Sequence, residues 1–504
     1  MMAAHTLSPG YPLSALLRNL VEVPVAAEVY VSGLATHSGR VRKGDLFIAS
    51  VPGNAGSVTY INDAVRAGAC AIVVEADSLP DPFLCPVPLY RIRDLCTKIG
   101  IIADRFYRHP SSAMTVIGVT GTNGKTTVSH LLAQALTLSG KGTCGLIGTL
   151  GYGTIDDLAP GPNTTPGAVA LQSLLAGMRE QHIRQVVMEV SSHGLDQCRT
   201  VGVEFYLAIL TNLSRDHLEY HITLENYAAA KRRLFTDYRI NQAVLNLDDD
   251  FGNSLAGELN AEVTGYTLNP RRAGEQQGKR PVMFGSITAS REGKMHMEVD
   301  GSWGKTTLVS PLLGRFNAYN MLASLSALCL LGHPLEQAAS WLSACRCIPG
   351  RMQCFSDSRQ PLVVVDYAHS PDALAQVLET LKEMCQGKIH CVFGCGGDRD
   401  KGKRPMMGAV AERYADNIIL TSDNPRSENP DLIIRDILGG IKNRAKVIVE
   451  PDRATAIAGA IQAAATGDIV LIAGKGHENV QEIAGKRLPF SDQQHVRNLL
   501  EDRS

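Results

Sequence analysis

Short apolar runs and amphipathic stretches alternate along most of the chain, a pattern typical of parallel β-strands covered by helices. In the first part, the apolar runs 45–49 and 69–74 enclose a helical pattern around 61–65. The middle part continues with the strand-like runs 185–190 and 207–211. Four more runs follow toward the C-terminus, at 361–366, 389–394, 417–421 and 468–473. The pattern predicts an α/β protein whose ligands bind at the carboxyl ends of parallel strands.

Breaks in this pattern divide the chain, whose 504 residues are too many for one hydrophobic core. The segment 109–112 and the turn at 348–351 mark two boundaries. We predict three α/β domains in series, with a central parallel sheet of the phosphate-loop ATPase type and a C-terminal Rossmann-like domain. Residues 268–310 predict a loop followed by an antiparallel excursion. The predicted domains are 1–110, 111–346 and 347–504.

Composition restricts the expected partners. The formal net charge is only −1, so neither nucleic acid nor an anionic membrane is expected as the main partner. No apolar run is long enough to span a bilayer and the first residues lack a secretory leader pattern, so a cytoplasmic protein is expected. The twelve cysteines are scattered without C-x-x-C pairs, which favours buried thiols over structural zinc. We expect small-molecule partners and a monomer.

The segment 118–127 predicts a phosphate-binding loop. It follows the apolar run 114–117 and precedes a helical pattern over 128–136. Strand, glycine-rich turn and helix is the context in which backbone N–H groups surround a phosphate at a helix N-terminus. Gly121 and Gly124 allow this close approach.

The loop also carries side chains suited to a nucleotide. Lys125 can reach the β- and γ-phosphates, and Thr126 can ligate Mg²⁺. The usual pattern places its first glycine at the position of Val119, whereas here Gly118 comes one residue early. The sequence therefore predicts a variant loop.

Two polar strand ends follow this loop. Glu189 ends an apolar run and is followed by Ser191, Ser192 and His193, so its carboxylate is a candidate ligand for the same Mg²⁺. A helix cap is the alternative role for Glu189. A second polar strand end lies at 212–217, and together they favour a composite site.

Two segments of the last part are candidates for binding charged groups. The glycine-rich, basic segment 394–404 lacks the third glycine of a dinucleotide fingerprint because Arg399 stands there, so it suits an anionic ligand or a solvated charge cluster. In the segment 421–426, Asp423 can accept from an ammonium group and Arg426 can bind a carboxylate. This pair suits a zwitterionic amino acid, and an ordinary Asx-Pro turn with an exposed arginine is the alternative.

The order of several motifs resembles that of the Mur ligases, the ATP-dependent amide-forming enzymes of peptidoglycan synthesis. The resemblance covers residues 30 to 490. Its motifs are 118–127, 189–193, 214–217, 314–317, 349–351 and 366–369. The segment 423–426 resembles the one with which the family recognises meso-diaminopimelate, and members that add lysine differ there.

The resemblance implies roles for individual residues, with ATP and Mg²⁺ as cofactors. ATP binding is implied for Gly121, Thr122, Asn123, Gly124, Lys125, Thr126, Thr127, Asn317, Arg351 and Asp366. Catalytic roles are implied for Lys125, Glu189, His217 and Lys231, and magnesium binding for Thr126, Glu189, His217 and Lys231 as a carbamate. Contacts to a UDP-linked muramoyl-dipeptide are implied for Ser38, Asn163, Thr164, Thr165, Ser191, Gln197 and Arg199. Contacts to meso-diaminopimelate are implied for Arg399, Asp423, Asn424, Pro425, Arg426, Gly474 and Glu478.

The implied reaction is amide formation through an acyl phosphate. At the uridine end the chain departs from the family pattern, with His37-Ser38-Gly39 and the segment 53–58 in place of the usual motifs. Three alternatives remain: a ligase that adds lysine, a paralogue with another acceptor, and a protein that uses the nucleotide only as a switch.

Overall fold

The computed structural model describes residues 10–49, 55–80, 82–276, 278–291, 294–355 and 360–501. Its chain forms two compact units, and strand β7 (Thr115–Thr120) runs from the first into the second. The first unit comprises Met1–Gly118, Gly142–Tyr206 and Asp237–Ile240. The second comprises Val119–Lys141, Leu207–Thr236 and Asn241–Ser504.

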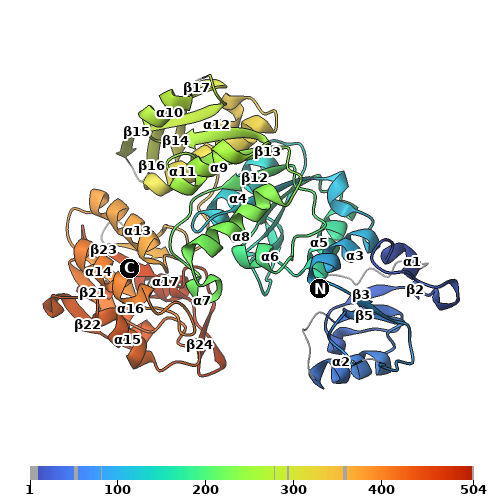
Figure 1. Cartoon of the computed structure of the whole chain (residues 1–504). Helices are drawn as coiled ribbons and strands as arrows, with labels where there is room; N and C mark the ends of the chain where they lie inside the picture. The colour runs from blue at the N-terminus through green and yellow to red at the C-terminus, as the bar shows by residue number, and fades with distance from the viewer. Residues whose placement is uncertain are drawn as a thin grey trace. The chain divides into compact units, whose positions relative to one another are not determined.

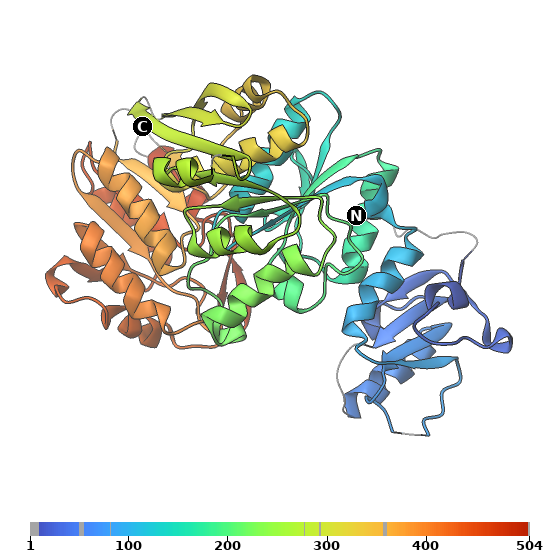
Figure 2. The ribbon, with the colours of Figure 1, turned by 45° about the horizontal axis from the view of Figure 1, so that its top comes forward.

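The first unit contains a small parallel sheet near the N-terminus, drawn in blue in Figures 1 and 2. Its strands, in spatial order, are β3 (Gly33–Ala35), β4 (Asp45–Ala49), β5 (Ala71–Glu75) and β6 (Leu89–Ile92). Alternate strand residues face opposite sides, so Leu46 and Val73 pack with helix α3 (Cys96–Phe106), while Phe47 and Ile72 pack with α2 (Ala55–Arg66). Ahead of the sheet lie β1 (Tyr11–Pro12), α1 (Leu13–Leu16) and β2 (Tyr30–Val31).

The rest of the first unit pairs strands of both directions. Strand β11 runs parallel to β8, β9 pairs antiparallel with β8, and β10 pairs antiparallel with β9. The strands are β8 (Cys144–Gly148), β9 (Gly151–Thr154), β10 (Asp157–Ala159) and β11 (Gln185–Glu189), and the helices are α5 (Ala168–Glu180) and α6 (Ser192–Asp196).

The second unit begins with the end of β7 and contains a mixed sheet and a second sheet that is parallel except for one edge strand. In the mixed sheet the strands β12 to β15 are parallel, and β16 and β17 return antiparallel. Its strands are β12 (Leu207–Leu210), β13 (Gln242–Asn246), β14 (Glu262–Thr267), β15 (Val282–Arg291), β16 (Lys294–Gly301) and β17 (Gly304–Ser310). Its helices are α4 (Lys125–Leu138), α7 (Leu218–His221), α8 (Leu224–Thr236), α9 (Asp250–Glu258), α10 (Pro270–Gln276), α11 (Arg315–Leu330) and α12 (Leu335–Ser343). The predicted antiparallel excursion is confirmed, but the predicted loop before it contains α10.

The last part of the second unit is a sheet with helices on both faces (Figure 1). In spatial order its strands are β18 (Gln353–Phe355), β19 (Leu362–Asp366), β23 (Ile469–Ala473), β20 (Ile389–Phe393), β21 (Asn417–Leu420) and β22 (Val447–Val449). One face packs against α13 (Pro371–Met384), α14 (Lys403–Tyr414) and α15 (Pro430–Leu438), and the other against α16 (Arg453–Ala463) and α17 (Asp492–Glu501). Only β18 is antiparallel to its neighbour. A hairpin of β24 (Val480–Ile483) and β25 (Lys486–Pro489) follows β23.

Candidate active site

The two loop glycines occupy positions that no side chain fits. Gly121 has φ of 148° and Gly124 has φ of 85°, both in the region that favours glycine. An added Cβ at Gly121 would lie 1.8 Å from the Thr211 hydroxyl oxygen, and one at Gly124 would lie 2.5 Å from Asn320 Oδ1. The loop backbone therefore takes the close-packed form expected of a phosphate-binding turn.

Neighbouring side chains fix the conformation of this loop. Asn123 N donates to Asn212 Oδ1 at 2.9 Å, and Thr211 Oγ1 donates to the Asn123 carbonyl at 2.6 Å. The Lys125 ammonium donates to the carbonyls of Gly121 and Thr122 at 2.8 and 2.9 Å. Lys125 therefore lies over the loop at the N-terminus of α4, where it and the helix dipole both favour an anion.

Lys231 reaches the same loop from α8. Its side chain is buried, with Nζ 2.7 Å from the Gly121 carbonyl oxygen and 4.4 Å from the centre of the Tyr227 ring. Burial and the charge of Lys125 hold the pKa of Lys231 well below its ordinary value, although Asp216 opposes this shift. The lowered pKa favours the uncharged amine of Lys231.

Asp216 is a buried carboxylate that sequence reasoning did not single out. His369 Nε2 lies 3.5 Å away, Lys403 Nζ lies 3.6 Å away, and His217 Nε2 lies 3.7 Å away. Burial alone would raise the pKa of Asp216, but the His369 hydrogen bond and the charges of Lys403 and His217 hold it well below its usual range. Asp216 therefore links His217 to two residues of the last part of the chain, a relation that no local sequence signal could have revealed.

Arg351 connects the phosphate loop to the strand ends of the last sheet. Its Nη2 donates to Thr126 Oγ1 at 3.1 Å, and its guanidinium stacks 4.4 Å above the Tyr367 ring. Asp366 accepts from the backbone N–H groups of Met352 and Ala368, both at 2.7 Å. Burial raises the pKa of Asp366, against the effect of the Arg351 cation. The structure thus places Thr126, Arg351 and Asp366 together.

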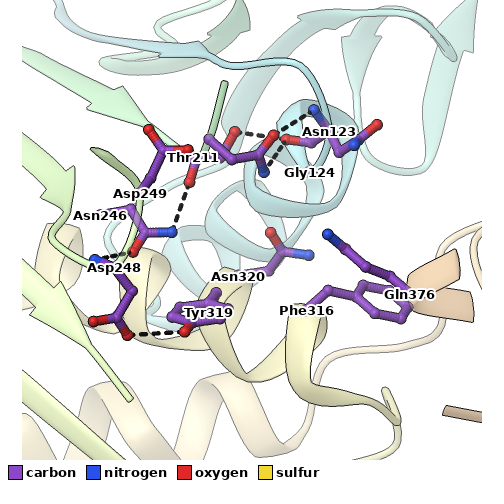
Figure 3. A pocket seen from close by; sticks show the side chains of 11 residues that line it. Asn123, Gly124, Thr211, Asn246, Asp248, Asp249, Phe316, Tyr319, Asn320 and Gln376 are labelled. Carbon is purple, nitrogen blue, oxygen red and sulfur yellow. Dashed lines mark hydrogen bonds between the residues drawn. The ribbon is translucent and has the colours of Figure 1, made fainter. Parts of the chain in front are cut away.

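A cavity of about 180 Å³ lies beside the loop (Figure 3). Its lining combines amide and carboxyl side chains with the rings of Phe316 and Tyr319. Asn317 does not line it but donates to the Leu313 carbonyl and accepts from Asn320. The lining residues are Asn123, Gly124, Thr211, Asn212, Asn246, Asp248, Asp249, Phe316, Tyr319, Asn320 and Gln376. The flat rings can stack on a nucleobase, and the amide groups can form hydrogen bonds with its edge, so this cavity suits a nucleobase.

The first unit holds Glu189 and the residues predicted to contact the muramoyl-dipeptide. Glu189 is fully buried and accepts from Thr149 N at 2.8 Å and from Thr149 Oγ1 at 3.0 Å. The helix-cap alternative is wrong, because Ser191 caps α6 by accepting from Gly194 N. Thr165 Oγ1 donates to the Glu189 carbonyl at 2.9 Å, which places Glu189 beside that predicted set.

The predicted dipeptide contacts join one another within this unit. Arg199 donates to the Thr165 carbonyl at 3.0 Å and to Gln197 Oε1, and Ser191 N donates to Thr165 Oγ1. Thr164 Oγ1 lies 3.0 Å from Thr149 Oγ1, and the Asn163 carbonyl accepts from the Tyr152 hydroxyl. Ser38 begins a short helical turn, Ser38–Arg40, in the small sheet region. Of the altered segment 53–58, residues 53 and 54 lie outside the described residues, as do the side chains of 55–57.

Most residues predicted to bind an amino acid converge at the carboxyl ends of β21 and β23. A Cβ at Gly474 would lie 2.4 Å from Asp423 Oδ2, and Asn424 Nδ2 donates to Glu478 Oε2 at 2.7 Å. Burial raises the pKa of Asp423, opposed by Arg453 and Lys475.

Two arginines adjoin this group. Arg426 is held by donation to the Gly397 carbonyl at 2.7 Å, and its side chain is only 22% exposed, so the alternative of an exposed arginine is wrong. Arg399 is exposed and donates to the Asp398 carbonyl. Pro425 is buried and its carbonyl oxygen packs against Gly397.

Comparison with known proteins gives the family. Residues 119–328 match the Mur ligase middle domain, and residues 350–476 match the Mur ligase glutamate ligase domain. The chain is 46% identical over 478 residues to the UDP-N-acetylmuramoyl-L-alanyl-D-glutamate--2,6-diaminopimelate ligase of Coxiella burnetii, covering 94% of this chain and 97% of that protein. The chain belongs to the Mur ligase family.

Further Mur ligases are similar to this chain in sequence or in structure. The ligase of the same name from Pseudomonas aeruginosa is 45% identical over 476 residues, covering 94% of this chain and 96% of that protein. A solved structure of a ligase of that name superposes with a TM-score of 0.67 at 35% identity, covering 98% and 99% of the two chains. A MurF ligase from Thermotoga maritima in complex with ADP has a TM-score of 0.61 at 19% identity over 94% and 98%, which shows the shared fold. The predicted α/β fold is confirmed, and the enzyme is a ligase.

The basic segment of this Mur ligase is partly internal, since Lys403 and Arg404 are buried whereas Arg399 and Lys401 are exposed. Arg404 is buried, 2.8 Å from Glu428 and 2.9 Å from Asp436, while Lys401 lies 3.4 Å from Glu428. Lys403 is buried against Asp216. Lys403 and Arg404 are therefore used internally, because carboxylates from other segments of the chain fold against them.

In the part of the chain that the structure describes, no group of three or more His, Cys, Asp or Glu side chains is placed to hold a metal ion. Among the same residues, no helix is long and apolar enough to cross a membrane.

The buried His130 of α4 makes the stability of this Mur ligase depend on pH. Burial, with the nearby Arg351 cation, lowers the pKa of His130 from 6.5 to about 3. Below about pH 6.5 the unfolded chain therefore binds a proton that the folded protein does not, so the free energy of unfolding falls as pH falls toward 3. Between pH 7.5 and 5, His130 should account for a loss of about 2 kcal/mol.

The measurement is urea unfolding at both pH values, followed by fluorescence of Trp303 and Trp341, which both lie in the second unit. His130→Gln should reduce the pH-dependent loss by about 2 kcal/mol. The exposed control His182→Asn should leave the loss unchanged. An unchanged loss in His130→Gln would contradict the assignment.

Proposed function

We propose that this Mur ligase uses ATP to join meso-diaminopimelate to UDP-N-acetylmuramoyl-L-alanyl-D-glutamate. The observation that carries the choice of amino acid is the convergence of Asp423, Asn424, Arg426, Gly474 and Glu478 at one end of the last sheet. A carboxylate and a guanidinium on one rim suit an amino acid that is zwitterionic at both ends. The relatives from Coxiella burnetii and Pseudomonas aeruginosa carry that activity in their names.

The proposed chemistry has two steps. A carboxylate oxygen of the acceptor's D-glutamate attacks the γ-phosphorus of ATP, the bond to the β-phosphate oxygen breaks, and ADP leaves. An amino group of diaminopimelate then attacks the acyl-phosphate carbonyl, the C–O bond breaks, and phosphate leaves as the amine loses its proton. Lys125 and Arg351 balance the charge of the transferring phosphoryl group, which is catalysis by positioning and electrostatics.

We propose that Thr126, Glu189, His217 and Lys231 as a carbamate hold Mg²⁺. The donor set fits only with that modification, since the Lys231 amine donates to the Gly121 carbonyl and offers no oxygen to a cation. As a carbamate it would add an anionic oxygen ligand, which Mg²⁺ prefers. When bound, the metal would neutralise charge on the phosphate oxygens.

The remaining assignments follow the family. We propose that Ser38, Asn163, Thr164, Thr165, Ser191, Gln197 and Arg199 contact the acceptor, and that Arg399, Asn424 and Pro425 complete the amino-acid site. Asn317 would act by holding Asn320 at the cavity in which we place adenine. We propose domains at 1–110, 111–346 and 347–504, and a monomer acting in the cytoplasm.

Phosphate release from ATP tests the function. We expect release when the UDP-linked dipeptide and meso-diaminopimelate are both present, and at least tenfold less with lysine. Equal or faster release with lysine would favour lysine addition, and activity with a UDP-free acceptor would favour a paralogue. ATP binding without amide formation under any condition would indicate a nucleotide switch.

Arg426→Ala should raise KM for diaminopimelate and leave KM for ATP within twofold. A lost hydrogen-bonded charge contact costs about 1.5 to 3 kcal/mol, or roughly 10- to 150-fold. The exposed Arg435→Ala is the control. Equal KM for diaminopimelate in the Arg426 variant and the wild type would refute its role.

A further inference from the structure

Lys475 is a fully buried lysine beside the proposed amino-acid site, with no role assigned above. Its ammonium donates to three oxygens: Asn424 Oδ1 at 3.0 Å, Glu478 Oε2 at 2.9 Å and the Val480 carbonyl at 2.7 Å. An ammonium has three N–H donors, so each has one acceptor. Lysine is rarely buried this completely unless it is paired, and here its partners are two residues that we place against the substrate.

The first consequence concerns the Asn424 amide. Its Oδ1 accepts from Lys475 and also from Glu482 N at 3.0 Å, so two donors fix the orientation of the amide. Its Nδ2 then donates to Glu478 Oε2 at 2.7 Å. A primary amide has two N–H donors. The second N–H of Asn424 is therefore presented in one fixed direction.

The second consequence concerns Glu478. Both Lys475 and Asn424 bind its Oε2, whereas Oε1 takes no hydrogen bond from the described residues. The Glu478 side chain is 26% exposed, and Oε1 is not among the buried polar atoms that lack a partner. A carboxylate oxygen presented in this way suits the ammonium group of an amino acid.

The third bond of Lys475 anchors the β24 hairpin, which holds Arg426. Val480 is the first residue of β24, and further along this strand the Glu482 carbonyl accepts from Arg426 N at 2.9 Å. Ala484 N in turn donates to the Arg426 carbonyl at 2.7 Å. Lys475 is thus bound directly to Asn424 and Glu478, and through the hairpin to Arg426.

We propose that Lys475 is a positioning residue that sets selectivity for an amino acid whose far end carries both an ammonium and a carboxylate group. Glu478 accepts from the ammonium, and Asn424 and Arg426 donate to the carboxylate. Free lysine as a substrate carries an ammonium group but no carboxylate at its far end. Discrimination against free lysine therefore depends on the two donors to the carboxylate, Asn424 and Arg426. Because Lys475 fixes the side chains of Asn424 and Glu478 and, through the hairpin, the backbone of Arg426, its loss relaxes this discrimination.

This inference rests on the proposed function, so the wild-type assay comes first. No phosphate release with diaminopimelate and the UDP-linked dipeptide would reject the proposed function itself. If the wild type is active, Lys475→Met removes the three bonds while nearly keeping the volume. The matched control is Lys442→Met, which changes an exposed lysine of the same sheet region.

For Lys475→Met we expect KM for diaminopimelate to rise about 10- to 100-fold, KM for ATP to stay within twofold, and the preference for diaminopimelate over lysine to fall at least tenfold. A role in folding alone would lower all activities together and leave the preference unchanged. That result, or an unchanged KM for diaminopimelate, would overturn the proposal.

A second variant keeps the proposal testable if the Lys475→Met protein does not fold. If Lys475→Met does not fold, Lys475→Gln is compared in the same way, since its amide keeps two donors. For Lys475→Gln we expect a preference for diaminopimelate over lysine that is weaker than in the wild type but not abolished. If both variants fail to fold, Lys475 serves the whole domain and the proposal is wrong.

Discussion

Lys125→Met is expected to lower kcat for phosphate release by a factor on the order of 10² to 10³. The Lys125 ammonium lies over the loop, bound to the carbonyls of Gly121 and Thr122. In the proposed first step negative charge moves among the phosphate oxygens. A fixed cation lowers the energy of that transition state more than that of bound ATP, so the loss should appear in kcat.

The measurement is steady-state phosphate release together with ATP binding by equilibrium titration. Lys141→Met, which changes an exposed lysine after the same helix, should match the wild type. A kcat within threefold of wild type in the Lys125 variant would exclude Lys125 from the chemical step.

Lys231→Ala is expected to lower kcat by a similar factor, roughly 10² to 10³, and added formate or acetate should restore part of the activity. Burial and the charge of Lys125 hold the pKa of Lys231 well below its ordinary value, which favours its uncharged amine. The uncharged amine reacts with CO₂ to give a carbamate and one proton. The product places an anion beside the phosphate loop.

A readout independent of activity tests the modification. Wild-type protein incubated with ¹³C-bicarbonate should show a carbamate carbon resonance that Lys231→Ala lacks. Lys231→Arg keeps a cation but cannot form the carbamate, so it should be inactive and should not respond to formate. The absence of the resonance from active wild-type enzyme would reject the carbamate.

Local sequence predicted the features that local geometry controls. The phosphate loop could be predicted from the sequence because the positions of Gly121 and Gly124 require backbone angles and close contacts that only glycine permits. The parallel strands could be found because burial on both faces requires continuous apolar runs. Helix α10 was missed, since its Gly- and Arg-containing sequence resembles a loop.

Some residue roles, such as those of Lys231 and Asn317, were predictable only because a family pattern supplied them. The sequence around Lys231 and Asp423 does not predict that these two side chains are buried. Asp216 and Lys475 were not predicted to be functional residues at all. Asn317 was predicted at the nucleotide, but Asn320, one helical turn later, lines the cavity.

By itself, therefore, the sequence determined the fold class, the phosphate loop and, through its motifs, the family. The tertiary structure alone decided how the charged side chains are used. Lys403 and Arg404 looked like an anion-binding loop, yet they face Asp216 and Glu428, which are far away in the chain. A side chain's charge is local, but its partner and its solvation depend on which distant segments fold against it, and these set its pKa and its role.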